Sequence, residues 1–403
     1  MSTRIAFVTP EYPPFVRGGA GVYAYRVTEE VSESGNDVVV FTPGTSDRDV
    51  DFELSRNLEV RRLGVGSLPF LRTLMFWVKL PRAMKKADEE CMFDVVHFNG
   101  LAYGSLVERV LDAPHLVTIH HLAIDSLGDS DLPTRSRIRN LGGERGFVAR
   151  LVEKRSIRIA DVVIAVSNYT KHRILEEYLI PDERVLVIRN GVDSSLLPAT
   201  NNDVAETRKG LSIPDGKLIL FVGRVDDPRK DLDTLIRAFG WVRQTVESHL
   251  LVVGGGNQDR ARNLVTSLGL SDHVSFFGYV AESLLKSCYA MCDVYVSTSR
   301  MEGFGLTIAE ALAAGKPVVV RDAGALKEIV ENGQNGIILK DPDYMTYGRA
   351  ILRILSDSSL SSKMALSSLS MASRLPSWLE TGHSTILAYT KSLKRWESRN
   401  GHL

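Results

Sequence analysis

The sequence predicts an α/β protein made of two tandem, doubly wound Rossmann-like domains, each a mostly parallel sheet covered by helices. Short β-branched runs alternate with helical stretches from end to end, which is typical of parallel βαβ units. Many of these runs are apolar on both faces, as strands between two helix layers must be. The 403 residues also exceed what one ordinary core holds. Because ligands bind beyond the carboxyl ends of such strands, two facing domains predict an interdomain cleft.

Strands are predicted where β-branched runs are bounded by turn residues. In the first half we expect them at residues 5–9, 38–42, 60–63, 95–98, 116–120, 162–166 and 185–188. In the second half we expect them at residues 218–222, 250–253, 274–277, 294–297, 318–320 and 336–339.

The boundary between the domains is predicted where this alternation stops. Residues 194–216 are polar, contain Pro198, Pro214 and Gly216, and show little apolar periodicity, so we expect a linker there. The first domain would then span residues 1–193 and the second residues 217–380. The last segment, 381–403, has helical periodicity and is expected to pack across the domain boundary.

Composition excludes several classes of protein. Lys and Arg number 49, and so do Asp and Glu, so overall charge points to no nucleic-acid partner. Cys91, Cys288 and Cys292 form no disulfide framework, and no nearby His or Cys completes a zinc site. We therefore expect structural thiols in a reducing cytosol.

The chain begins with Met1-Ser2-Thr3-Arg4 and runs straight into a predicted strand, without a signal-peptide pattern. Its most membrane-like stretch, Leu68 to Leu80, is interrupted by Arg72 and Lys79 and is too short to span a bilayer. The expected location is the cytoplasm, with peripheral contact at the inner face of the membrane as a further expectation. The sequence leaves the oligomeric state open.

The stretch from Ser299 to Pro317 is the most informative in the chain. A strand ends, Gly303 and Gly305 make a turn, and good helix formers run from Leu306 to Ala314. The unpaired backbone N–H groups at such a helix start attract anions, phosphate above all. Glu302 and Glu310 flank this site and suit hydroxyl groups, which is the layout of a nucleotide-sugar. The alternative is an ordinary strand–glycine–helix turn.

Cations follow the first strand of the second half. Arg224 and Lys230 are expected at the carboxyl end of that strand, with Arg229 as a third candidate. Fixed cations stabilise the negative charge that builds on a departing pyrophosphate. The alternative is a solvated charged loop, since Asp226 and Asp227 are neighbours.

A second glycine turn follows the first predicted strand. Gly18 and Gly19 precede a helix expected from Ala20 to about Ser34. The loop is too long for the dinucleotide-binding glycine motif, so we interpret it as an anion or sugar contact. An ordinary flexible loop is the alternative.

Histidines end another strand of the first half. His120 and His121 follow Val117-Thr118-Ile119, and strand alternation directs only one of them toward the ligand. We favour His120, with a structural histidine as the alternative.

Three further patterns are interpreted as structural. The acids of Asp49-Val50-Asp51 and Asp129-Ser130-Asp131 read as loop residues rather than metal ligands. The basic stretch 135–158 reads as a solvated helix face, with a membrane or an anionic acceptor as the alternative. Phe70, Phe76 and Trp77 read as core, with an acceptor or lipid contact as the alternative.

These residues together resemble a known family. Over essentially its full length the chain resembles the retaining nucleotide-sugar glycosyltransferases of GT-B fold, family 4. The matching features are Gly18-Gly19, Thr118-Ile119-His120, Ala165-Val166-Ser167, Asn190-Gly191-Val192-Asp193, Gly223-Arg224 with Lys230, Phe277-Gly278-Tyr279, and Glu302-Gly303-Phe304-Gly305 with Glu310. Many relatives have His-Asp where this chain has His120-His121.

The resemblance implies roles for the two domains and for single residues. The first domain would bind the acceptor and the second the nucleotide-sugar. The implied catalytic residues are His120, Arg224, Lys230 and Glu302. The implied donor-binding residues are Gly18, Gly19, Phe277, Gly278, Tyr279, Val280, Phe304, Gly305, Leu306, Thr307 and Glu310.

Within these sets the resemblance assigns contacts. Arg224 and Lys230 would hold the donor diphosphate. Glu310 would bind the ribose and Glu302 the transferred sugar, while His120 would contact the hexose. The 277–280 segment would lie against the nucleobase, and the amides of 304–307 would meet sugar or phosphate oxygens.

The implied reaction moves a hexose from a UDP- or GDP-sugar, such as GDP-mannose, to an acceptor hydroxyl with retention of configuration. No metal or other cofactor is expected. The acceptor would be a glycan, a lipid-linked sugar or a small molecule. Two alternatives from other classes are a nucleotide-sugar epimerase on the same two-domain architecture and a non-catalytic sugar-nucleotide sensor.

Overall fold

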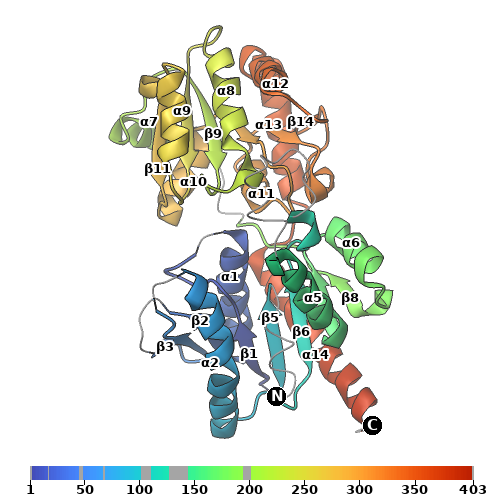
Figure 1. Cartoon of the computed structure of the whole chain (residues 1–403). Coiled ribbons are helices and arrows are strands. Elements are labelled where there is room, and N and C mark those ends of the chain that lie inside the picture. The colour runs from blue at the N-terminus through green and yellow to red at the C-terminus, as the bar shows by residue number, and fades with distance from the viewer. Residues whose placement is uncertain are drawn as a thin grey trace. The chain divides into compact units, whose positions relative to one another are not determined.

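The computed structural model describes residues 2–16, 18–44, 49–66, 69–100, 110–126, 144–193 and 201–401. The chain divides into two compact units, each an α/β domain (Figure 1). The first unit combines Met1–Gly191 with Trp378–Leu403, and the second is Val192–Ser377. The predicted fold class, two tandem doubly wound α/β domains, is confirmed.

The sheet of the first unit has the strand order β3-β4-β2-β1-β5-β6-β7-β8. Its strands are β1 Arg4–Val8, β2 Asp37–Pro43, β3 Val50–Ser55, β4 Leu58–Leu63, β5 Val95–Asn99, β6 His115–Ile119, β7 Val162–Ala165 and β8 Val185–Val187. All pairings are parallel except β3 with β4. Every predicted strand of this half is present within a few residues of its expected bounds.

Helices cover both faces of this sheet. Their bounds are α1 Gly19–Glu33, α2 Pro69–Glu90, α5 Glu144–Ile159, α6 Asn168–Tyr178 and α14 Trp378–Asn400. One face packs a core in which Phe76 of α2, Ile157 of α5 and Ile174 of α6 join the strands. On the other face Phe7 of β1 and Tyr389 of α14 both stack edge-on against His97. The alternation of buried residues along each strand thus feeds two cores.

The C-terminal helix α14 belongs to the first unit. It starts at Trp378, three residues before the predicted segment. Thr381 Oγ1 donates to the Arg189 carbonyl at 3.0 Å, and the Tyr389 hydroxyl lies 2.9 Å from His97 Nδ1. A Cβ on Gly382 would come within 2.5 Å of Glu30 Cβ, so glycine lets α14 approach α1 closely. The chain therefore returns to the first unit to complete its second helix layer.

The sheet of the second unit has the order β11-β10-β9-β12-β13-β14, and all its pairings are parallel. The strands are β9 Lys217–Val222, β10 Ser248–Val253, β11 Val274–Gly278, β12 Val294–Ser297, β13 Val318–Arg321 and β14 Gly336–Leu339. They coincide with the predicted strands of this half to within two residues.

Besides helix α7, Asn201–Gly210, the described part of the second unit has the helices that flank this sheet. They are α8 Leu232–Val242, α9 Asp259–Ser267, α10 Glu282–Met291, α11 Leu306–Ala313, α12 Tyr344–Ser356 and α13 Ser358–Ala372. Phe239 of α8, Val265 of α9 and Ile351 of α12 share one core with the strands. Short 3-10 helices join several elements: η1 Ile124–Ser126, η2 Asp182–Arg184, η4 Pro228–Lys230, η5 Ser271–His273 and η6 Gly324–Glu328.

Two segments that the sequence marks as irregular contain regular structure. The predicted linker 194–216 contains helix α7, Asn201–Gly210, which the structure assigns to the second unit. Arg208 of α7 donates to the carbonyls of Pro214 and Gly216, which ties the polar segment down without an apolar pattern. Strand β3 was not predicted, and it places Val50 and Asp51 in a sheet edge rather than a loop.

No helix in the described ranges is both long and apolar enough to cross a membrane.

Candidate functional site

The turn between β12 and α11 is shaped by Gly305. Its φ of 89° is left-handed, and a Cβ there would lie 2.6 Å from Leu326 Cδ2, so only glycine fits without strain. No side chain caps α11. The amide of Ile308 donates to the Gly305 carbonyl at 3.0 Å. For the amides of Leu306 and Thr307 no acceptor is recorded among the described residues, so the helix start can bind an anion.

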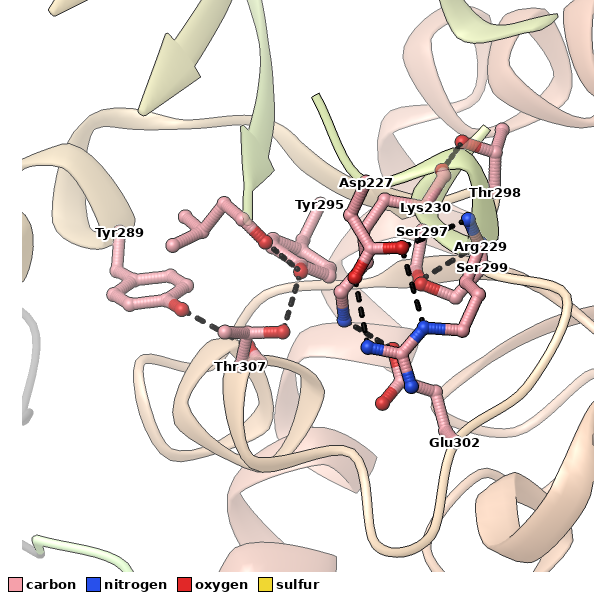
Figure 2. Close-up of polar contacts among 11 residues, drawn as sticks. Asp227, Arg229, Lys230, Tyr289, Tyr295, Ser297, Thr298, Ser299, Glu302 and Thr307 are labelled. Carbon is pink, nitrogen blue, oxygen red and sulfur yellow. Dashed lines mark hydrogen bonds and ion pairs between the residues drawn. The ribbon is translucent and has the colours of Figure 1, made fainter. Parts of the chain in front are cut away.

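An ion pair lies beside this helix start. Lys230 Nζ is 2.6 Å from Glu302 Oε1, and Figure 2 shows the amine directed at the carboxylate. The two side chains are only 22% and 14% exposed. Thr298 Oγ1 donates to the Lys230 carbonyl at 2.7 Å. The Glu302 carbonyl accepts the Ala325 amide at 2.9 Å, so backbone contacts fix both partners.

Glu302 is held in its ionised form. Burial alone would raise the pKa of Glu302, but the charge and hydrogen bond of Lys230 outweigh burial and lower that pKa overall. An ionised carboxylate accepts hydrogen bonds and donates none. Glu302 is therefore suited to binding hydroxyl groups and unsuited to acting as an acid.

Two neighbouring arginines are tied to aspartates. The Arg229 guanidinium contacts both carboxylate oxygens of Asp227, at 3.2 and 2.8 Å, and its amide donates to Asp227 as well. Arg300 donates through Nε and a terminal nitrogen to a single oxygen of Asp231, Oδ2, at 3.2 and 3.0 Å. The fork-like pair of Arg229 with Asp227 is strong and geometrically specific. Arg229 and Arg300 are therefore structural, and their charge is already balanced.

Arg224 is differently placed. It follows β9 and pairs with Asp226 at 3.0 Å, and the two side chains are 41% and 34% exposed. Exposed pairs of this kind contribute little free energy and exchange partners readily. Of the predicted phosphate cations, Arg224 can reorganise around a ligand, whereas Lys230 is already held beside the α11 turn.

Two tyrosines position the polar side chains of α11. The Tyr289 hydroxyl donates to Glu310 Oε2 at 2.7 Å, and Tyr295 donates to Thr307 Oγ1 at 2.8 Å (Figure 2 draws the Tyr295 contact). Burial raises the pKa of Tyr289 well above its usual value, so the hydroxyl keeps its proton. Neither tyrosine was predicted as a site residue, because both read as apolar members of their own elements, α10 and β12, and their contacts with α11 are tertiary.

The carboxyl end of β11 carries the predicted base-contacting segment. Gly278 has a φ of 63° and its carbonyl accepts the Gly254 amide at 2.7 Å. Tyr279, the next residue, is 71% exposed. Phe277 and Val280 are half-buried. An exposed ring at the end of a parallel strand is available to stack against a flat ligand group.

In the first unit, His120 follows β6 and is held by Asn99 of β5. Its Nε2 lies 2.7 Å from Asn99 Oδ1, while Asn99 Nδ2 donates to Thr9 Oγ1 and to the Ala20 carbonyl. This amide orientation assigns the proton of the imidazole to Nε2 and the lone pair to Nδ1. Asn99 was not predicted as a site residue, although a polar residue at the carboxyl end of a buried strand is a signal for such a site.

Burial lowers the pKa of His120 from 6.5 to about 3, with the neighbouring His121 as a second cause. The ring is therefore neutral near pH 7. Tyr23 packs edge-on against it, with ring centroids 5.0 Å apart, and the Tyr23 hydroxyl lies 3.3 Å from Thr118 Oγ1. His120 is thus a fixed, uncharged hydrogen-bonding group.

The glycine turn of the first unit opens α1. Gly18 is the N-cap in extended conformation, without a side-chain cap, and its amide donates to Glu11 Oε2 at 3.1 Å. A Cβ on Gly18 would meet no protein atom within 4 Å. Gly18 and Gly19 are both exposed. Arg17 lies outside the described residues.

Other predicted features lie apart from these groups or outside the described residues. Asp129 and Asp131, the basic residues 135–140 and the Phe70 side chain are not described. Asp49 accepts the Gly64 amide and pairs with Lys79, so it is structural. Phe76 is in the core, as predicted. Over the ranges that the structure covers, no cluster of metal-ligand type is found. Cys288 and Cys292 are buried free thiols, and Cys91 is an exposed one.

Two family models match the chain. Residues 17–196 match the model described as "Glycosyltransferase Family 4", and residues 203–368 match "Glycosyl transferases group 1". One relative is an uncharacterised glycosyltransferase of Methanocaldococcus jannaschii, 29% identical, with 88% of this chain and 89% of the relative aligned. Another is the mannosylfructose-phosphate synthase of Agrobacterium fabrum, 29% identical over 83% of this chain and 78% of the relative.

Solved structures share the fold. The sucrose-phosphate synthase of Thermosynechococcus elongatus superposes with a TM-score of 0.83, at 24% identity, over 96% of this chain and 98% of the other. The HepE protein of Anabaena, solved in complex with UDP and glucose, superposes with a TM-score of 0.73, at 21% identity, over 96% and 99%.

Proposed function

The chain belongs to the glycosyltransferases of GT-B fold, family 4, and on this premise we propose that it transfers a hexose from a UDP- or GDP-sugar to an acceptor hydroxyl with retention of configuration. The second unit would bind the nucleotide-sugar and the first unit the acceptor. The observation that carries the proposal is the Lys230–Glu302 pair beside the uncapped start of α11. A cation, a carboxylate and backbone amides within one turn suit the sugar–phosphate junction of such a donor.

The donor diphosphate would be held by positive groups of the second unit. Lys230 and the amides of Leu306 and Thr307 would meet phosphate oxygens, and Arg224 would leave Asp226 to join them. These groups stabilise the charge that develops on the leaving diphosphate without needing a metal ion. The HepE protein, solved in complex with UDP and glucose, supports a uridine donor rather than a guanosine donor.

The sugar and the nucleoside would meet the remaining groups. Glu302, held ionised, would accept hydrogen bonds from hexose hydroxyls. Glu310, oriented by Tyr289, would accept those of the ribose. Tyr279 and its neighbours would lie against the base. Each assignment follows from an acceptor or a ring at a strand's carboxyl end.

In the proposed reaction, the acceptor oxygen forms a bond to the anomeric carbon as the bond from that carbon to the phosphate oxygen breaks. The bonding electrons pass to the diphosphate, and the acceptor proton passes to the departing phosphate oxygen. Attack and departure on one face retain the configuration. Glu302 is engaged by Lys230 at 2.6 Å, which favours this path over one in which Glu302 forms a covalent intermediate.

His120 would contact the hexose through Nδ1. Because the ring is neutral and Nε2 is bound to Asn99, Nδ1 can accept a hydrogen bond from a sugar hydroxyl. The group would orient the sugar and would not move a proton near pH 7.

The test is a screen of nucleoside diphosphates by thermal shift, followed by donor turnover. We expect UDP or GDP to raise the Tm of the protein by mass action. The corresponding nucleotide-sugar should be hydrolysed slowly to the nucleoside diphosphate when no acceptor is present. With an acceptor, the anomeric configuration of the product is read by NMR, and activity should survive EDTA. An inverted product, or no turnover of any UDP- or GDP-sugar, would overturn the proposal.

The epimerase alternative gains no support. The mannosylfructose-phosphate synthase and the sucrose-phosphate synthase are named for synthesis and not for epimerisation. The same turnover assay separates the two reactions. An epimerase changes the configuration of the donor sugar and forms no product with the acceptor, whereas a transferase forms that product and releases the nucleoside diphosphate.

A further inference from the structure

A basic pocket of about 560 Å³ lies in the first unit, apart from the groups discussed above. Its cationic lining is Arg158, Arg184, Lys391, Lys394, Arg395 and Arg399. Asp161 precedes β7 and Arg184 precedes β8, so the pocket lies at the amino ends of these strands. His120 follows the carboxyl end of β6, which is the opposite edge of the same sheet. The pocket is therefore separate from the candidate site of this unit.

Two cations of the lining, Arg184 and Lys391, donate hydrogen bonds to backbone carbonyls. Arg184 donates to the carbonyls of Ile157, Arg158 and Ala160, which end α5. Lys391 donates to the Glu183 carbonyl at 2.8 Å. These contacts place cations against the free carbonyls of a helix end and a turn, where positive charge is favourable.

Asp161 is the one carboxylate in the pocket lining, and it is already engaged. Its Oδ2 accepts the His115 amide at 3.0 Å, and its Oδ1 pairs with Arg399 at 3.1 Å. Glu183 lies near Arg184 but outside the lining. One carboxylate that is bound to the fold leaves most of the positive charge of the pocket unbalanced.

Two cations have no structural role of this kind. For Lys394 and Arg395 no hydrogen bond or ion pair is recorded within the described part of the chain, and neither lies in the last turn of a helix, whereas Arg158 lies in the last turn of α5. Lys391, Lys394 and Arg395 are three and four residues apart on α14, so they share one face of the helix and repel one another. Burial and the charge of Arg395 both lower the pKa of Arg184. Crowding of this kind destabilises the unliganded protein.

Simple alternatives leave the cluster unexplained. The chain has no net charge, so a general basic character does not account for six cations around one hollow. The helix dipole accounts for Arg158 in the last turn of α5 and for Arg399 in the last turn of α14, but Lys391, Lys394 and Arg395 lie before the last turn of α14. A solvated helix face would not draw in Arg158 and Arg184 from two other elements.

We propose that this pocket is a second anion site, which binds a phosphate-bearing ligand. Guanidinium groups match phosphate oxygens in pairs, and several cations that converge on one hollow suit a doubly or multiply charged group. The phosphate comes either from a soluble compound or from a lipid headgroup at a membrane surface. The site is independent of the proposed donor site, because it lies in the other unit.

The test compares the full chain with two double variants of equal charge change. Lys394→Ala with Arg395→Ala removes the two pocket cations that have no structural contact. Arg353→Ala with Lys363→Ala removes two exposed cations of α12 and α13 in the second unit. Inorganic pyrophosphate is titrated by calorimetry, and cosedimentation is measured with vesicles of phosphatidylglycerol and of phosphatidylcholine.

We expect wild type and the control to bind pyrophosphate at a site that weakens about tenfold or more in the pocket variant, which is about 1.4 kcal/mol. The Lys230→Ala variant should keep this site, which separates it from the donor site. Cosedimentation with phosphatidylglycerol that is lost only in the pocket variant assigns a lipid headgroup, and pyrophosphate binding alone assigns a soluble phosphate. Equal binding in both double variants, or none in wild type, overturns the proposal.

Discussion

Two glycine turns open helices in this molecule, and they differ in what holds them. Gly305 in the second unit has a φ of 89°, is buried, and has the side chain of Leu326 where a Cβ would stand. Gly18 in the first unit is extended and exposed, and a Cβ there would meet open space. The fold requires glycine at the first position and tolerates a side chain at the second.

The surroundings differ in the same way. Beside Gly305 lies the half-buried pair of Lys230 and Glu302, where charge is held ready. In the first unit, His120 and Asn99 make neutral hydrogen bonds. The second unit thus holds its charged side chains in fixed places, whereas the glycine turn of the first unit is open. The same local motif is therefore fixed by packing in the second unit and is free of such packing in the first.

The largest effect is expected from Lys230→Ala. It removes the cation that we propose to meet the leaving diphosphate, so transfer should fall about a hundredfold or more, which is about 2.7 kcal/mol in the barrier. The measurement is kcat/KM for the matching donor, with the Tm recorded alongside.

The control is Lys217→Ala, which breaks a pair with Asp293 whose side chains are 46% and 29% exposed. Such a pair contributes little, so activity should stay at the wild-type level. If Lys230→Ala lowers the rate by less than about tenfold, the catalytic assignment is wrong.

The next effect is on stability. Gly305→Ala forces a side chain into a left-handed conformation and against Leu326, which should cost roughly 1–3 kcal/mol in unfolding free energy. Gly333→Ala is the matched control, because Gly333 has a φ of 81° but no atom within 4 Å of its Cβ position. Denaturant unfolding of both should show the larger loss for Gly305→Ala. Equal losses would mean that packing against Leu326 contributes nothing.

A third prediction concerns pH. Burial lowers the pKa of His97 to about 3 and of His115 to about 4 in the first unit, and that of His249 to about 4 in the second. The unfolded chain binds these protons below about pH 6.5, whereas the folded chain does not. Stability that is present above pH 6.5 is therefore lost as the pH falls, by about 1.4 kcal/mol per pH unit for each histidine.

His120 in the first unit also has its pKa lowered to about 3, so three histidines of the first unit and one of the second take up protons on unfolding. Hydrogen exchange, corrected for intrinsic rates, should show the first unit losing protection about three times as steeply as the second between about pH 6.5 and 5. Between about pH 7 and 8 the protection of both units against exchange should not depend on pH, since these histidines do not titrate there. A steeper loss in the second unit would contradict the prediction.

Much of the fold could be predicted from sequence because parallel strands buried on both faces leave a strong apolar signal, as β7 and β12 do. Strand β3 carries charged residues at an antiparallel edge, and helix α7 is held by polar contacts of Arg208, so neither leaves that signal. Apolar periodicity in a sequence indicates burial, and it does not reveal elements that are held mainly by hydrogen bonds.

The candidate site shows the same limit. Lys230 and Glu302 were both predicted, because each follows the carboxyl end of a strand. Their direct contact joins positions 72 residues apart, and no local pattern predicts it. The orienting hydroxyl of Tyr289 and the amide of Asn99 act through tertiary contacts of the same kind.

The smallest expected effect tests the open turn. Gly18→Ala puts a methyl group where no protein atom lies, so the loss in unfolding free energy should stay within about 1 kcal/mol, the difference between glycine and alanine at an N-cap. If the space at α1 is kept for a ligand, kcat/KM should still fall, by about tenfold or less. Gly210→Ala, at the end of α7 and also without neighbours at its Cβ position, controls for the added methyl group. Wild-type kinetics in Gly18→Ala would mean that this glycine serves neither packing nor binding, and the contrast with Gly305 would then be one of structure alone.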